Sequence, residues 1–193
     1  MHFLHCVLAE WQLVRVRLLR SRLGIWLLLL GVASVAVHLR ARTQELESLA
    51  LRVGMLGALL GIAFAAGSDA DRAALAITLS HPTTPLAVAL GRWLAAVTAS
   101  ACAMLAALVA TVTIGRADGT DLLLAARTGA LSSAAVAAAA LAGVWLGGNT
   151  VAAALFLYIG LAGTPPVPGW AQVFVTVGGV AAGALLLMRR PHV

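Results

Sequence analysis

The longest uncharged stretch of this chain covers residues 128–188, which are 61 positions without Asp, Glu, Lys or Arg. A helix that crosses the hydrocarbon core of a bilayer needs about 20 apolar residues, so this stretch has room for more than one crossing. The whole chain is 62% hydrophobic and 10% charged, whereas about 25% of a soluble domain is charged. These values predict an integral membrane protein and exclude a soluble enzyme, a disordered chain and a disulfide scaffold.

Charged residues and helix breakers divide the chain into expected spans. Pro165, Pro166 and Pro168 end any helix that reaches them. A single helix over residues 128–163 would measure about 54 Å, against a hydrocarbon core of about 30 Å. That segment is therefore expected to turn near residues 147–150. We expect a single all-α transmembrane domain over residues 1–193 with six spans, at about 23–39, 49–67, 93–115, 128–146, 150–163 and 170–188.

The first segment, residues 2–22, is not a clean span. Apolar residues recur at helical spacing from Leu4 through Trp11 to Leu18, while most charged residues fall between them. This pattern predicts an amphipathic helix that lies in the membrane interface and leads into the first span. The alternative is the charged n-region of a signal peptide, with residues 23–35 as its apolar region.

Arginine placement gives the expected orientation. All 13 basic residues are arginine, and they punctuate apolar runs, as topology signals do, rather than forming a nucleic-acid-binding patch. With both termini in the cytoplasm, the cytoplasmic segments hold Arg15, Arg17, Arg20, Arg22, Arg72, Arg92, Arg189 and Arg190. The opposite ends hold Arg40, Arg42, Arg52, Arg116 and Arg127. The positive-inside rule therefore favours cytoplasmic termini, which agrees with an even number of spans.

The segment between the second and third expected spans carries helix start and stop signals. Ser68 precedes Asp71 by three residues, which has the form of a capping box, and acidic residues favour a first helical turn. Pro82 disfavours helical geometry at His81. The sequence thus predicts a short helix over about residues 69–81 on the cytoplasmic side.

This segment resembles the cytoplasmic loop of permease subunits of type-2 ATP-binding-cassette (ABC) exporters. The resemblance rests on Asp71-Arg72, on Leu79-Ser80-His81-Pro82 and on Leu90-Gly91-Arg92, together with the six-span layout. Ala73-Ala74 and Ala76 depart from the family pattern, which commonly has Gly-Thr and an acidic residue there. The structural alternative is an ordinary loop that only joins two helices.

The resemblance implies a lever, called a coupling helix, that docks on a separate ATPase subunit. The ATPase-coupling residues would be Asp69, Asp71, Arg72, Leu75, Leu79, Ser80, His81, Pro82, Gly91 and Arg92. The implied partners are two ABC ATPase subunits, a second permease subunit that is identical or related, and the lipids of a bacterial inner membrane. ATP and Mg²⁺ would bind to the ATPase, and this chain would bind no cofactor, metal or nucleic acid.

The chain itself carries no nucleotide-binding loop, because that motif needs a lysine and the sequence has none. We therefore expect no enzymatic activity in this chain. The expected spans hold no buried carboxylate, which argues against a proton or sodium pathway. A lipophilic or amphipathic substrate moving outward past Thr98, Thr111, Ser132 and Asn149 is the transport hypothesis. The alternative function is a membrane scaffold or assembly subunit of a larger complex.

Overall fold

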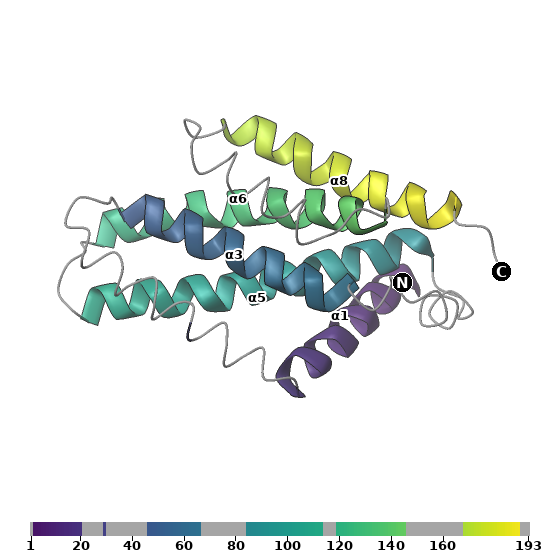
Figure 1. Cartoon of the computed structure of the whole chain (residues 1–193), viewed down its shortest axis with the longest axis horizontal. Helices are drawn as coiled ribbons and strands as arrows, with labels where there is room; N and C mark the ends of the chain where they lie inside the picture. The colour runs from purple at the N-terminus through teal and green to yellow at the C-terminus, as the bar shows by residue number, and fades with distance from the viewer. Residues whose placement is uncertain are drawn as a thin grey trace.

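Five helices form the described part of the molecule, and no strand occurs among those residues (Figure 1). The computed structural model describes residues 2–20, 29, 46–66, 84–113, 119–145 and 168–189. The helices are α1 (His2–Arg20), α3 (Leu46–Ala66), α5 (Pro85–Thr113), α6 (Gly119–Trp145) and α8 (Gly169–Arg189). The predicted all-helical fold is confirmed for this part of the chain.

Three of these helices are long and apolar enough to cross a membrane: Pro85–Val112 in α5, Leu122–Trp145 in α6 and Gly169–Arg189 in α8. Shorter apolar helices cover Leu49–Ala63 in α3 and Phe3–Val14 in α1. These lengths are compatible with a membrane-embedded protein. The expected first span at 23–39, the fifth span at 150–163 and the short helix at 69–81 lie outside the described residues, apart from the helical Leu29.

Helix α5 begins upstream of the third span expected at 93–115. The Ala87 N–H donates to the Thr84 carbonyl oxygen at 2.8 Å and lies 3.3 Å from the Thr84 hydroxyl oxygen. Thr84 is therefore the N-cap, and Pro85 occupies the first helical position, where its missing N–H costs nothing. The helix extends without interruption through Arg92, which the sequence analysis had used as the boundary.

Helix α6 likewise begins upstream of the fourth span expected at 128–146. It starts at Gly119, and Arg127 is an exposed residue within the helix. Helix α8 occupies nearly the range expected for the sixth span, because the Ala171 N–H donates to the Pro168 carbonyl oxygen at 2.9 Å and so starts the helix directly after the prolines.

Close backbone contacts define the directions of the helices. In α3 and α5, Gly57 lies against Ser100 and Gly61 lies against Ala96, so these two helices are antiparallel. In α6 and α8, contacts join Ala138 to Gly179 and Trp145 to Gly183, in parallel order.

The contacts between α3 and α6 also run in parallel order. Ala50 contacts Gly129, and Gly54 contacts both Gly129 and Ser133. Helices α3, α6 and α8 thus point the same way, and α5 points the other way.

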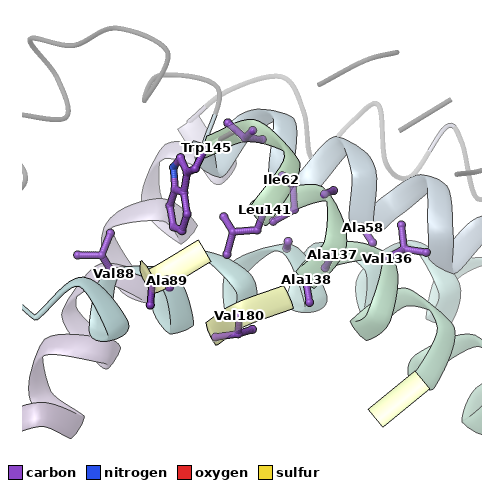
Figure 2. Close-up of a cluster of buried hydrophobic side chains, with 14 of the residues drawn as sticks. Ala58, Ile62, Val88, Ala89, Val136, Ala137, Ala138, Leu141, Trp145 and Val180 are labelled. Carbon is purple, nitrogen blue, oxygen red and sulfur yellow. The ribbon is translucent and has the colours of Figure 1, made fainter. Parts of the chain in front are cut away.

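Small residues build the core. The main buried cluster places Ala58, Val136 and Ala138 among a few larger side chains such as Leu141 and Trp145 (Figure 2). Lipid tails are as apolar as these side chains, so helices in a membrane associate through close packing rather than through the hydrophobic effect. Alanine and glycine permit that packing because they let helix backbones approach each other closely.

Helix α8 lies at the edge of the bundle along α6 (Figure 1). Its spanning segment is 28% buried, compared with 50% for that of α5. Trp170 and Phe174 are exposed on its outer side, with their rings edge to face at 6.2 Å. A large exposed apolar surface of this kind suits contact with lipid tails.

Helix α1 crosses one end of the bundle obliquely (Figure 1). It packs on the first half of α5, and Val14 joins Ala65 near the end of α3 and Ala95 of α5 in a small buried cluster. The N-terminal helix is therefore part of the packed structure at the end where α3 stops and α5 starts.

Candidate functional site

The residues expected to contact an ATPase divide into two groups. Those on the short helix lie outside the described residues: Asp69, Asp71, Arg72, Leu75, Leu79, Ser80, His81 and Pro82. Gly91 and Arg92 are described and lie in the second turn of α5. The structure therefore gives the surroundings of the candidate site: the end of α3, the start of α5, and α1.

The two helices that flank residues 67–83 are held tightly together. A Cβ atom added at Gly61 would lie 2.7 Å from the Cα atom of Ala96, which leaves no room for a side chain between α3 and α5. The buried hydroxyl of Ser100 donates to the Gly54 carbonyl oxygen at 2.7 Å and adds an interhelical hydrogen bond. A force applied to the connecting segment would therefore act on α3 and α5 as one unit.

Gly91 is the contact point between α5 and α1. A Cβ atom there would lie 2.6 Å from Glu10 Cβ and 3.1 Å from the Val7 carbonyl oxygen. Only glycine fits at this distance. The position carries a packing function in this structure, whether or not it also contributes to contact with an ATPase.

Arg92 is buried, with 4% of its surface exposed, and it interacts with its surroundings there. A guanidinium group is costly to bury unless its donors are met. Its burial makes Arg92 a structural residue of this end of α5 and not a freely exposed basic contact, as the position before a membrane span would have indicated.

A side-chain hydrogen bond adds to the α1 contact. The Trp11 indole Nε1–H donates to the Thr98 hydroxyl oxygen at 3.2 Å, and that hydroxyl donates in turn to the Leu94 carbonyl oxygen at 2.8 Å. Thr98 was expected on a substrate pathway. The structure instead shows its hydroxyl engaged between α1 and α5.

The other described pathway residues are also engaged within the protein. Thr111 is fully buried and donates to the Ala107 carbonyl oxygen of its own helix at 2.8 Å. The Ser132 hydroxyl oxygen accepts from the Gln172 amide at 3.1 Å, which links α6 to α8. Asn149 lies outside the described residues. The three described positions are spread over different helix contacts and do not gather into one site.

Within the described ranges, no group of three or more His, Cys, Asp or Glu residues could hold a metal ion. Cys6 and Cys102, on α1 and α5, are free thiols. The arrangement of the described residues offers helix packing and mechanical connection rather than a constellation for covalent chemistry.

The sequence analysis did not predict that α1 docks on α5. Two signals pointed to it: the helical spacing of Val7, Trp11 and Val14, and a glycine at position 91 within a helix. Neither signal identifies the partner helix, because the sequence gives no pairing between them.

Comparison with known proteins identified no matching family model, no matching curated protein and no matching solved structure.

Proposed function

We propose that this chain is the permease subunit of an ATP-driven ABC exporter. In this proposal, residues 69–82 form a coupling helix that docks on a separate ATPase, and closure of two ATPases drives two permease subunits through alternating access. The cargo is a lipophilic or amphipathic molecule that leaves the cytoplasm or the inner leaflet. The chain contributes conformational change and no hydrolysis of its own.

One observation carries this proposal: the segment with the family-like motif joins two helices that are locked against each other. Helix α3 ends at Ala66, α5 begins at Pro85, and Gly57, Gly61 and Ser100 hold them in close contact. Helix α1 adds a third element at the same end through Val14. This is the mechanical arrangement that a lever requires, because a push on the connection displaces whole helices.

The helix directions support the six-span layout. Helix α1 contacts the end of α3, whereas α3 begins at the other end of the bundle, so the chain has to cross between Arg20 and Leu46. Helices α6 and α8 are parallel, so the chain has to return between Trp145 and Gly169. The 22 residues at positions 146–167 would span about 33 Å as a helix, about the thickness of the hydrocarbon core. These two crossings correspond to the expected spans at 23–39 and 150–163.

The proposed orientation has both termini in the cytoplasm of a bacterial cell. The ends of α3, α6 and α8 and the start of α5 lie at one end of the bundle, which is also the end that α1 crosses. Arg189 ends α8 at this end. The arginine count of the sequence supports assigning it to the cytoplasm.

The test is ATPase coupling in a reconstituted complex with the ATPase encoded beside this chain. Reversing the charges with Asp71→Arg and Arg72→Asp should abolish permease-dependent stimulation of ATP hydrolysis, because both side chains would face the ATPase. The matched control is Arg116→Asp with Asp118→Arg, which reverses the same charges between α5 and α6 at the opposite end. This control should retain stimulation.

Two outcomes would favour the scaffold alternative. One is that no ATPase co-purifies with the detergent-solubilised chain. The other is that an associated ATPase hydrolyses ATP equally well with the variant, the control and the wild-type chain.

A further inference from the structure

Helix α1 has two sides with different surroundings. Its packed face, formed by Val7, Glu10, Trp11 and Val14, lies against α5 and the end of α3. Its outer side carries large apolar side chains that are 39–65% exposed: Phe3, Leu4, Leu8, Leu13 and Val16. Exposed apolar side chains of this size on a helix interspersed with polar residues mark a surface for a membrane or a protein partner.

The charges on this helix are arranged unevenly. Arg15, Arg17 and Arg20 occupy its C-terminal half, and Arg22 follows within two residues. The only acidic residue in the sequence of α1 is Glu10, whose Cβ position lies against Gly91 on the packed face. The helix therefore combines an exposed apolar first half with a strongly basic second half, which is complementary to a surface that is both apolar and anionic.

Its position favours a lipid surface as the partner. Helix α1 is attached to α5 over residues 91–98, near the start of a helix that is long enough to cross a membrane. An element attached near the end of a spanning helix is held at the level of the headgroups. Clusters of arginine at this level attract acidic lipids, and each arginine strengthens the attraction by roughly fivefold.

We propose that α1 is a binding surface for anionic phospholipids. Its exposed apolar side chains enter the boundary between headgroups and acyl chains, and its arginines contact lipid phosphates. This inference goes beyond the transport function and does not depend on the presence of an ATPase. Because Val14 packs with Ala65 and Ala95, bound lipid also steadies the two helices that flank residues 67–83.

Hydrogen exchange on the full chain in lipid nanodiscs tests this proposal. Two compositions are compared: phosphatidylcholine alone, and phosphatidylcholine mixed with phosphatidylglycerol. Amides of residues 3–14 should exchange at least about tenfold more slowly in the anionic discs. High salt should remove the difference, because it screens the arginine–phosphate attraction.

A quadruple variant assigns the effect to the arginines. Arg15→Gln, Arg17→Gln, Arg20→Gln and Arg22→Gln together should abolish the difference between the two compositions. The matched control, Arg40→Gln, Arg42→Gln, Arg116→Gln and Arg127→Gln, removes the same net charge elsewhere. In the control, residues 3–14 should still exchange more slowly in anionic discs.

Equal exchange of the wild-type chain in the two compositions would overturn the proposal, and this comparison needs no variant to fold. Slowing that persists in the α1 quadruple variant would also overturn it. Slowing that appears only after a soluble protein is added, with no dependence on lipid charge, would identify the outer side of α1 as a protein-docking surface instead.

Discussion

At the scale of single residues, glycine decides how closely the helices approach. The space beside a glycine differs sharply along this chain. At Gly61, an added Cβ atom would lie 2.7 Å from the backbone of Ala96, whereas Gly178 has nothing within 4 Å. The two positions therefore provide a direct test of packing, since the same substitution meets an opposing helix at one site and open space at the other.

Gly61→Ala should destabilise the protein by about 1–3 kcal/mol, because α3 and α5 must separate to admit the methyl group. Gly178→Ala is the matched control, with the same change in helix propensity and no steric cost. Thermal unfolding in detergent should show a lower Tm for the first variant only. Equal Tm values for the two variants would contradict the close contact between α3 and α5.

Ser100 and Thr111 are both buried hydroxyl residues on α5, but they play different roles. Ser100 donates to Gly54 on α3, whereas Thr111 donates to its own helix. Ser100→Ala should cost about 0.6 kcal/mol, the average for an interhelical hydrogen bond in a membrane. Thr111→Val removes no bond between helices and should cost less. Chemical unfolding in micelles measures both, and the reverse order would count against the assigned partners.

At the scale of elements, the bounds of α8 were predicted more closely than the starts of α5 and α6. Pro168 and Arg189 are physical ends of α8, so the breaker and the charge marked real boundaries. Arg92 and Arg127 were also read as boundaries, yet α5 and α6 continue through them. The rule failed because one arginine is buried beneath neighbouring helices and the other lies exposed within a helix.

The capping signal at Thr84-Pro85 was present in the sequence and would have located the start of α5. The pairing of the elements was not accessible in the same way. An interhelical bond such as Ser100 to Gly54 depends on which helices meet and at what height. Periodicity within one segment carries no information about that choice. The placement of Thr98 and Ser132 in helix contacts, rather than on an open pathway, was missed for the same reason.

Helix α1 should be separable from the rest of the bundle by one substitution. Gly91→Val places a side chain where Glu10 and the Val7 carbonyl lie, so α1 should detach while α6 and α8 stay packed. Hydrogen exchange of residues 3–14 should accelerate about tenfold or more, as expected for an overpacking cost of ~1–3 kcal/mol. Exchange in α6 and α8 should not change. Gly178→Val is the matched control, and an equal acceleration of α1 in that control would contradict this account.

At the scale of the whole molecule, the helix directions predict the sidedness of the chain. Single cysteines at Ala70→Cys, Ala117→Cys and Val193→Cys, in a background that lacks Cys6 and Cys102, report on three points along the chain. A membrane-impermeant thiol reagent should label the first and third from the cytoplasmic side and the second from the other side. Labelling of residues 70 and 117 from the same side would contradict the antiparallel crossing of α3 and α5.

The proposed mechanism treats the molecule as a bundle driven from one end. Helices α3 and α5 are packed without space between them, α1 is attached to both, and the motif-bearing segment joins them. The opposite end of the bundle, where residues 114–118 connect α5 to α6, has no such motif. An ATPase should therefore contact the chain at only one of these two connections.

Site-specific photo-crosslinking in the assembled complex tests this claim most directly. A photoreactive amino acid replaces Leu79 in one variant and Ala117 in the control, and products are collected with and without ATP. The account predicts a crosslink from position 79 to an ATPase subunit, with a yield that changes with nucleotide, and none from position 117. Crosslinks from position 79 to lipid alone, in a complex that hydrolyses ATP and transports its cargo, would contradict it.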